Sequence, residues 1–408
     1  MVGLRVFYAD EQGDGMTAET KKALRIETIR VKEVCKMALQ KLQHLHPDEV
    51  VPVTRTRALS LSMNPYADPD DVALLLAYCD ELCIGYLSVV PCMLRTEEEL
   101  RKVYFLSQWY VAPEHRASGA GALLLMNGMR LDHDLVMTGL SRDAERVFRS
   151  GPFKEFRPLE YYMVFMDGLD VLGFPAFLAE KLLENQGRTS KLLHRVAVRK
   201  TKFLYPLVKR LVYGALNTVH RCIAPHVAIE EVDSLEDALD SLPDPEQAAL
   251  FHRGPEAIHW MISYPWYTEN GVTAATGYFF GEHSPLFRYV VLRIKDTRNN
   301  QPLGFVVFSV SNRTSRVVMK TLDFRMAKPE HARYLITAAL HCASRYQADR
   351  IFLPKECRPF LRSLLMMRWL TFRRKRACFC RILQKDSALA TAIDDVELHL
   401  ADGDCAFS

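Results

Sequence analysis

The stretch VYFLSQWYVAPEHRASGAGALLLMNGMR, residues 103–130, decides how the rest of the chain is interpreted. Its first part, 103–111, is rich in β-branched and aromatic residues, which favour an extended strand. Pro113 ends that strand, and Gly119 and Gly121 precede an apolar segment with the length of a helix. The stretch therefore predicts a strand, a glycine turn and a helix in immediate succession.

The glycine turn is suited to an anion. Gly119 and Gly121 have no Cβ to obstruct a ligand, and the first turn of a helix carries unpaired N–H groups at a positive dipole end. The spacing Arg-x-x-Gly-x-Gly from Arg116 differs from the dinucleotide pattern Gly-x-Gly-x-x-Gly, and no Lys-Ser/Thr follows as in a P-loop. We therefore expect a diphosphate here, held in another way.

The residues Arg116-x-x-Gly119-x-Gly121, with the lead-in WYVAPEHR over 109–116, resemble the acetyl-CoA loop of the GNAT superfamily of N-acetyltransferases. The resemblance implies that loop amides hold the pyrophosphate of acetyl-CoA or another acyl-CoA, and that pantetheine lies beside the preceding strand. It also implies transferase activity. The cofactor-binding residues that it implies are Tyr110, Val111, Arg116, Ala117, Ser118, Gly119, Ala120, Gly121 and, after the next strand, Ser141.

The elements around this stretch follow the order of the same family. A hairpin is predicted from the apolar runs 72–78 and 84–90, and its second arm contains Ile84-Gly85-Tyr86, a hydrophobic-Gly-hydrophobic pattern that resembles the family's. A strand at 135–140, a helix at 142–149 and a strand at 161–166 complete the unit. The expected fold class is α/β (α+β), with a mixed sheet.

Two positions depart from the family pattern. Ser141 stands where the family usually has an asparagine that binds pantetheine, and Phe148 stands where it has a tyrosine that protonates the departing thiolate. Phe148 has no proton to give, and the strand 103–111 contains no carboxylate. Three alternatives stay open. Water or another group transfers the proton, for which one of Tyr161 and Tyr162, on opposite faces of their strand, is the candidate; a well-oriented amine reacts by proximity; or the site binds acyl-CoA without turnover.

Composition bounds the class of protein. The 408 residues are 49% hydrophobic and 25% charged with a net charge of +4, which is ordinary for two or three globular domains and too weakly basic to indicate specific nucleic-acid binding. No secretory signal or membrane span is apparent, so we expect a cytoplasmic protein. The ten cysteines lack the spacing of zinc ligands, and no metal site is predicted.

We expect four segments: an acyl-CoA-binding GNAT-like domain over 1–170, a basic amphipathic connector over 171–229, a degenerate GNAT-like domain over 230–385 and an acidic tail over 386–408 that frays. Within the connector, 188–221 alternates basic and apolar residues. It is interpreted as a helical link whose apolar side packs inward, or as a contact with a peripheral membrane surface or a polyanion.

The degenerate domain repeats the predicted order of strands and helices. It has its own hydrophobic-Gly-hydrophobic arm at Leu303-Gly304-Phe305, but the segment 328–333 after its long strand contains no glycine. Close approach of backbone amides to a diphosphate is therefore not expected there. We expect this domain to shape the acceptor site, with an aromatic group that lines a pocket or packs in the core: His259, Trp260, Tyr264 and Trp266.

The sequence as a whole predicts a tandem GNAT-like acyltransferase that moves an acetyl or related acyl group to an amine. The acceptor is expected to be a small molecule, a glycan or a peptide amine. The alternative is a noncatalytic acyl-CoA-binding, sensing or assembly protein. A single amphipathic helix or a helix pair is also expected over 16–45, ahead of the hairpin.

Overall fold

The computed structural model describes most of the chain outside the N-terminal segment and the basic connector. The described residues are 23–43, 46, 48–95, 100–166, 210–211, 213–214, 218, 224–233, 250–251, 253–269, 277–312, 316–363, 370–383, 390, 392–394, 396, 398–403 and 407. The connector 171–229 and its segment 188–221 thus lie almost wholly outside the described residues.

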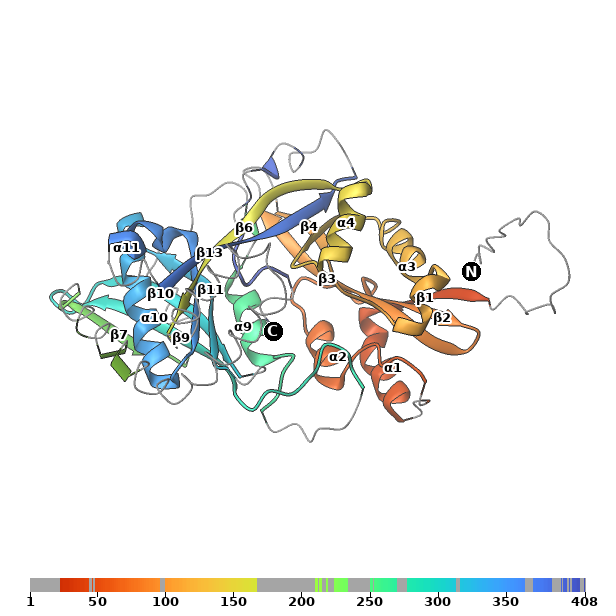
Figure 1. Cartoon of the computed structure of the whole chain (residues 1–408), viewed down its shortest axis with the longest axis horizontal. Coiled ribbons are helices and arrows are strands. Elements are labelled where there is room, and N and C mark those ends of the chain that lie inside the picture. Colours follow the sequence, from red (N-terminus) through yellow and green to blue (C-terminus); the bar gives the residue numbers. More distant parts are fainter. Residues whose placement is uncertain are drawn as a thin grey trace, which may run out of the picture.

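The described strands form one 13-stranded mixed sheet that runs through the whole molecule (Figure 1). Its path is β1-β2-β3-β4-β5-β13-β6-β12-β11-β10-β9-β7, and β8 pairs with β3. We call residues 23–166 the first half and residues 224–383 the second half. The α/β fold class predicted from the sequence is confirmed, but the two predicted domains share a single sheet.

The first half contains six strands and five helical segments. They are β1 (Leu24–Arg30), α1 (Val31–Gln43), α2 (Arg55–Ser62), β2 (Val72–Cys79), β3 (Leu82–Arg95), β4 (Leu100–Val111), the 3₁₀ helix η1 (Pro113–Ser118), α3 (Ala120–Gly128), β5 (Asp134–Thr138), α4 (Arg142–Ser150) and β6 (Lys154–Phe165). The predicted hairpin, cofactor strand, helix and following strand are all present.

The second half has a similar order of strands and helices. They are β7 (Val227–Glu231), β8 (Leu250–Phe251), α9 (Pro255–Ser263), β9 (Phe287–Asp296), β10 (Pro302–Ser311), β11 (Val318–Met326), η3 (Pro329–Ala332), α10 (Arg333–Tyr346), β12 (Arg350–Pro354), η4 (Lys355–Cys357), α11 (Arg358–Ser363) and β13 (Thr371–Arg381).

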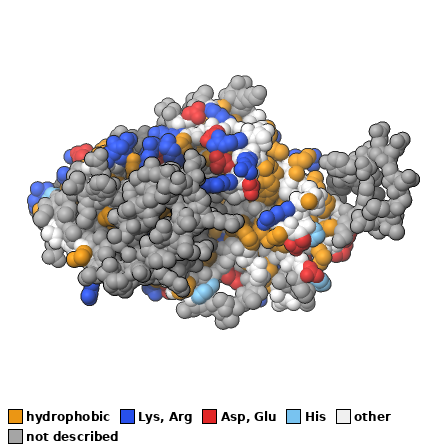
Figure 2. All heavy atoms as spheres, viewed as in Figure 1, with side chains coloured by type: hydrophobic (Ala, Val, Ile, Leu, Met, Phe, Trp, Pro, Cys, Tyr) orange, Lys and Arg blue, Asp and Glu red, His pale blue; other side chains and the backbone are white. Residues whose placement is uncertain are grey.

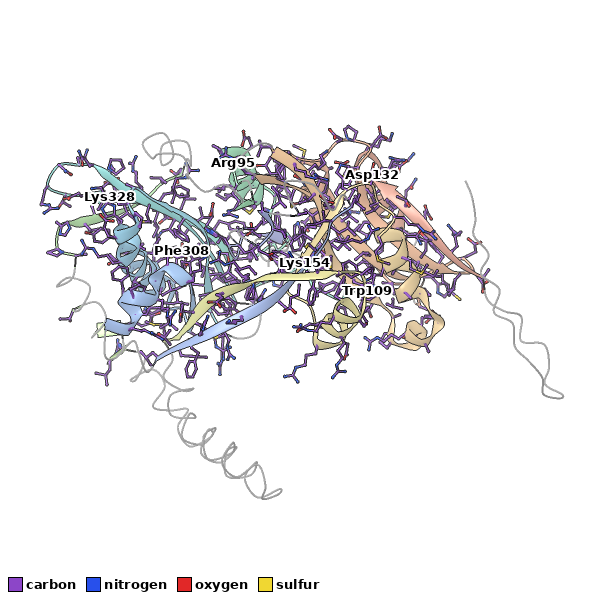
Figure 3. The ribbon with its side chains drawn as sticks, turned by 90° about the horizontal axis from the view of Figure 1, so that it is seen from above. Arg95, Trp109, Asp132, Lys154, Phe308 and Lys328 are labelled. Atoms are coloured by element: carbon purple, nitrogen blue, oxygen red, sulfur yellow. The ribbon has the colours of Figure 1, made fainter. Side chains whose placement is uncertain are left out.

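The two halves exchange their last strands. The second half's β13 lies between β5 and β6, where Cys378 is paired with Thr138 on one side and Phe156 on the other. In turn β6 of the first half pairs with β12, so that Tyr161 lies opposite Pro354. Figure 3, in which Lys154 marks the start of β6, shows both strands crossing from one half to the other. The exchange joins the halves through backbone hydrogen bonds.

The predicted helix over 16–45 is partly wrong. Residues 24–30 form β1, which pairs antiparallel with β2 along its whole length, and the helix begins only at Val31. The apolar residues at three- and four-residue spacing in this segment indicated a helix, but the edge of β2 offers backbone partners that a helix would leave unpaired. Residues 16–22 lie outside the described part.

The prediction that the acidic tail frays is wrong for its described residues. Ile393 and Val396 are each 1% exposed, and Phe407, also 1% exposed, is stacked on Trp266 with ring centroids 4.6 Å apart. The acidic residues suggested a solvated segment, but apolar residues between them pack into the core between the halves. Of the predicted aromatic group, Trp260 and Trp266 belong to this core.

Candidate cofactor site

Strands β4 and β5 separate along their length. They run parallel and pair only from Val103 to Phe105, opposite Asp134 to Val136. The strand β4 continues to Val111, whereas β5 ends at Thr138, whose neighbour on the other side is β13. The last six residues of β4, 106–111, therefore do not pair with β5. Such an open edge can pair with an extended ligand as if it were an added strand.

A β-bulge reshapes this open edge. Two residues of β4, Gln108 and Trp109, face the single residue Leu87 of β3, because the pairing shifts between Tyr86 and Ser88. Gln108 has φ of 54°, which is the left-handed region and rare for a residue with a side chain. Bulges of this kind redirect backbone groups and are frequent beside functional sites.

The turn after β4 has the backbone conformation that the glycine pattern predicted. Gly119 has φ of 85° and precedes α3, whose first amide, that of Ala120, donates to Ser118 Oγ at 3.3 Å. An added Cβ at Gly121 would lie 3.5 Å from the Trp109 ring. The bulge and the start of α3 are thus in close contact, and the exposed turn places helix N–H groups beside the open strand edge.

Aromatic side chains lie on the face of the sheet opposite to the face that α3 covers. Tyr110 is stacked on the exposed ring of Phe279 at 4.3 Å, and Tyr86 lies 5.9 Å from the ring of Tyr278. The Tyr278 hydroxyl donates to Gln108 Oε1 at 2.9 Å, which ties the second half to the bulge. The sequence did not predict this aromatic group. Gln108 and Tyr278 are 170 positions apart, and the bulge that brings them together has no sequence signal.

Tyr86 and Tyr110 of this group keep their phenol protons at neutral pH. Burial raises the pKa of Tyr86 far above its usual value, and Tyr278 adds to that shift. Burial also raises the pKa of Tyr110, against the opposing effect of the Arg116 guanidinium. A phenol with a raised pKa stays protonated, so it can donate a hydrogen bond but does not act as a base.

The predicted cofactor residues fall into two groups. Those from Tyr110 to Gly121 follow one another along the end of β4, η1 and the start of α3. Arg116, Ala117, Ser118 and Gly119 are exposed, whereas Val111 and Ala120 are buried. Ser141 is exposed and caps α4, where its Oγ accepts from the Ala144 amide at 3.3 Å. Its role toward a cofactor stays a prediction.

Tyr161 and Tyr162 lie elsewhere. They are on β6 opposite Pro354 and Leu353 of β12, and two strands, β5 and β13, separate β6 from β4. Three strand spacings correspond to about 14 Å. Tyr161 is stacked on Phe352 at 5.2 Å, whereas Tyr162 lines a separate pocket between β6 and residues of the second half. Their predicted catalytic role stays untested, and this placement does not favour it.

Phe148 is part of the core beneath the site. It is 2% exposed and its ring lies 4.6 Å from Phe153, 5.9 Å from Phe379 and 6.0 Å from Trp109. The ring therefore supports the bulge residue Trp109 by packing. It offers no hydroxyl to a ligand.

The described residues contain no group of three or more His, Cys, Asp or Glu side chains that is arranged to hold a metal ion. The eight cysteines among them are free thiols. Within the same ranges, no helix has the length and apolar content needed to cross a bilayer.

No family model matches the sequence, and no curated protein matches it. Solved structures do resemble the fold. A GCN5-related N-acetyltransferase from Anabaena variabilis has a TM-score of 0.44 at 10% identity, over 88% of this chain and 73% of that one. Saccharomyces cerevisiae N-myristoyltransferase with bound myristoyl-CoA has a TM-score of 0.46 at 10% identity, over 91% and 81%.

A third structure, a GCN5-related N-acetyltransferase from Kribbella flavida, has a TM-score of 0.43 at 11% identity, over 90% of this chain and 73% of that one. The similarity is one of fold. At these values it assigns no role to any residue of this chain, so the roles proposed below rest on the geometry of the chain itself.

Proposed function

We propose that this protein is an acyl-CoA-dependent N-acyltransferase, and that its cofactor site is the open edge of β4 together with the turn at Gly119. The observation that carries the proposal is the combination of three features in one place. Parallel strands separate, a bulge turns the backbone of the longer one, and a left-handed glycine at a helix start follows that strand after the 3₁₀ helix η1.

The residues present fit such a cofactor. The amides of the first turn of α3 suit a diphosphate, and Arg116 adds a cation at the exposed turn. The backbone of β4 from Leu106 to Val111 suits the amide groups of pantetheine, which pair in the manner of a strand. An acyl-CoA bound there supplies an activated thioester. The acyl chain, acetyl or longer, is not fixed by these contacts.

The chain's own residues position the acceptor more than they exchange protons with it. No Asp or Glu lies on β4, and the tyrosines around the bulge are held neutral. The amine therefore enters in its neutral form and reacts by proximity and orientation. We expect kcat/KM for the amine to rise with pH up to the pKa of that amine, with no earlier plateau.

The acceptor proposed is a primary amine on a small molecule, a glycan or a peptide, in a cytoplasmic setting. The four segments predicted from the sequence remain the proposed domain organisation, with the second half shaping the acceptor side through Tyr278 and Phe279. Contact of 188–221 with a membrane surface or a polyanion stays a proposal about residues that are mostly not described.

Matched glycine variants test the cofactor site. Gly119 and Gly277 both have positive φ, 85° and 65°, and at both an added Cβ meets nothing within 4 Å. The changes Gly119→Ala and Gly277→Ala thus impose similar backbone strain of about 1 kcal/mol. We expect only Gly119→Ala to weaken CoA binding, by about tenfold or more in calorimetry, because only that turn contacts the diphosphate. Equal affinities in both variants contradict the proposed site.

Phe148 favours a second candidate function, an acyl-CoA-binding protein without turnover. Its buried ring removes the one family position from which a tyrosine would protonate the thiolate. Thiol release from acetyl-CoA and longer acyl-CoAs across a panel of amines separates the two functions. Sustained release above the rate without protein supports the enzyme, whereas CoA binding without release across the panel supports the second function.

A further inference from the structure

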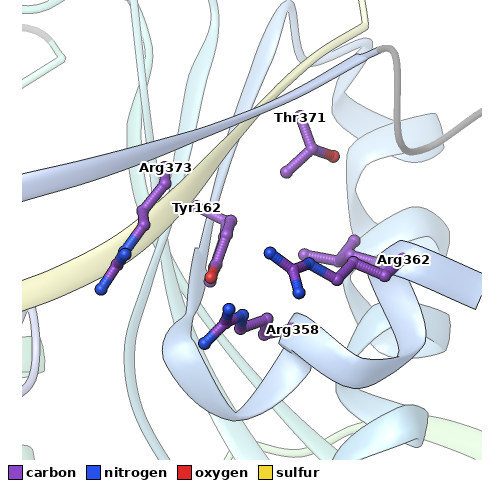
Figure 4. Close-up of a pocket in the computed structure, with 6 residues that line it drawn as sticks. Tyr162, Arg358, Arg362, Thr371 and Arg373 are labelled. Carbon is purple, nitrogen blue, oxygen red and sulfur yellow. The ribbon is translucent and has the colours of Figure 1, made fainter.

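A pocket of about 530 Å³ lies between β6 of the first half and β13 and α11 of the second half (Figure 4). It is bounded by β6, β13 and α11, and its residues Tyr162 and Leu361 belong to the same hydrophobic cluster as the buried residues of α10. The residues that line it are Tyr162, Arg358, Leu361, Arg362, Thr371 and Arg373. Half of these side chains are guanidinium groups, and none is acidic. The lining therefore selects for negative charge.

Two of the three arginines have no counter-charge among the described residues. Arg358 and Arg362 lie one turn apart on α11, and neither forms an ion pair with a described carboxylate. Like charges at this spacing repel one another. Arg373 differs, since it is held by Glu160 with distances of 2.5 and 2.6 Å. Among the described residues, one guanidinium is thus fixed by a carboxylate and two are not.

Neutral polar atoms complete the lining. Tyr162 is 8% exposed, and Figure 4 shows its hydroxyl pointing between the side chains of Arg358 and Arg373. The hydroxyl of Thr371 is buried without any hydrogen-bond partner.

We infer that this pocket binds a phosphate-bearing small molecule. Guanidinium groups pair with phosphate oxygens in a bidentate manner. A phosphate carries enough charge and oxygen atoms to bind both Arg358 and Arg362 and the Tyr162 hydroxyl, whereas a single carboxylate does not. The volume is that of a small-molecule site and is larger than a lone inorganic ion needs. The charged group lies against Arg358 and Arg362, and the remainder of the molecule lies over Tyr162 and Leu361. This site is independent of the proposed acyltransferase function.

The surface charge beside the exchanged strands is mixed. Figure 2 shows Lys and Arg side chains interspersed with Asp and Glu side chains along the upper part of the molecule. On β13, Arg373 and Lys375 both pair with the carboxylate of Glu160. The positive charge that we assign to the pocket therefore comes from Arg358 and Arg362.

Binding of two probes, inorganic pyrophosphate and ADP, to the full-length protein tests the inference. Calorimetry compares the wild type with Arg358→Gln/Arg362→Gln, which removes both unpaired charges at exposed positions. The control Arg146→Gln/Arg374→Gln removes two exposed arginines outside the pocket, so it changes net charge equally. We expect the pocket variant to lose at least thirtyfold in affinity for either probe and the control to lose less than threefold.

Tyr162→Phe supplies the second readout, because it keeps the ring and removes only the hydroxyl. We expect about a tenfold loss for both probes, as for a hydrogen bond to a charged group. Absence of probe binding in the wild type, or equal losses in the pocket and control variants, overturns the inference. Binding of a single-stranded RNA oligomer that depends on Arg358 and Arg362, without pyrophosphate or ADP binding, overturns it in favour of a polymer. Retained CoA binding in the pocket variant shows that the two sites are separate.

Discussion

The two halves of the molecule share an order of elements but differ at the end of their long central strands. In the first half β4 leads through η1 to Gly119, whereas in the second half β11 leads through η3 to Ala332 and Arg333, with no glycine. Both long strands carry a bulge, at Gln108 and Trp109 in one and at Leu322 in the other. The shared fold thus provides a bulged long strand in each half, and the residues after that strand determine whether an anion can bind there.

The corresponding opening of the second half is filled by the chain itself. The strands β11 and β12 pair only from Val318 to Lys320, so they separate as β4 and β5 do. At the bulge, Leu322 accepts a hydrogen bond from the Ala401 amide at 3.1 Å, and His399 is stacked on Phe324 at 5.0 Å. Tail residues therefore take the place beside β11 that we propose for pantetheine beside β4.

The largest expected effect comes from breaking the contact that fixes this tail. Arg253 joins Asp323 of β11 to Asp402 of the tail, at 3.1 and 2.6 Å, and all three side chains are at most 10% exposed. Burial raises the pKa of Asp402, and Arg253 opposes that shift. Arg253→Met leaves two buried carboxylates without their cation, so we expect a loss of about 3–5 kcal/mol in the free energy of unfolding.

Urea denaturation at pH 7 measures this loss. Arg345→Met is the control, since Arg345 pairs with Glu231 at an exposed position, and we expect it to cost less than 1 kcal/mol. Similar losses in the two variants would mean that the tail contact contributes no more than a surface ion pair. The folded fraction of Arg253→Met should keep its CoA affinity, because the change affects the filled opening alone.

A smaller effect comes from the two glycines that face the long strands. An added Cβ at Gly85 would lie 2.7 Å from the Tyr110 carbonyl oxygen, and one at Gly304 would lie 2.6 Å from that of Arg325. Both positions require the neighbouring backbone to shift, so Gly85→Ala and Gly304→Ala should each destabilise the protein by about 1–3 kcal/mol.

Only one of these changes should affect the cofactor. Gly85→Ala displaces Tyr110, which lies on the proposed pantetheine edge, so we expect CoA affinity to fall by about tenfold. Gly304→Ala displaces the corresponding backbone of a strand that binds no cofactor, and the affinity should stay within twofold. Calorimetry with CoA on the folded variants measures both, and a similar fall in each would remove the functional distinction between the halves.

The sequence predicted most strands and helices of both halves because each repeats the same local signals. The β-branched run ending at Val111, the Gly119 turn and the apolar helix after it depend on neighbours in the chain, and so does the arm around Gly304. The absence of glycine after β11 was also visible in the sequence, and the expectation that no diphosphate binds there stays a prediction.

Features that depend on distant partners could not be predicted. Whether β6 and β13 stay in their own halves or exchange places is not encoded locally. The residues around Tyr162 are compatible with a strand in either position. The burial of the tail depends on the opening beside Leu322, which the acidic composition of 386–408 did not indicate. The bulge at Gln108 is likewise set by pairing across β3 and not by a sequence signal.

The smallest expected effect concerns the exchanged strands, where Glu160 of β6 pairs with Arg373 and Lys375 of β13. The hydrogen bond from Arg373 is the main cause that lowers the pKa of Glu160 from 4.5 to about 2. A carboxyl whose pKa is lowered by folding stabilises the folded state at pH values above the pKa that it has in the unfolded chain. This contribution is complete above about pH 4.5 and is lost as the pH falls toward about 2.

Glu160→Gln should therefore cost about 1 kcal/mol at pH 7, after allowance for solvent screening of this partly exposed pair. The difference from the wild type should shrink steadily as the pH is lowered from 4.5, because the wild-type carboxyl becomes protonated while glutamine does not titrate. Urea denaturation at several pH values between 7 and 3 measures it. Glu155→Gln is the control, since Glu155 pairs with Arg149 within the first half. A pH-independent difference for Glu160→Gln would show that the strands are joined there by packing and backbone hydrogen bonds, and not by this ion pair.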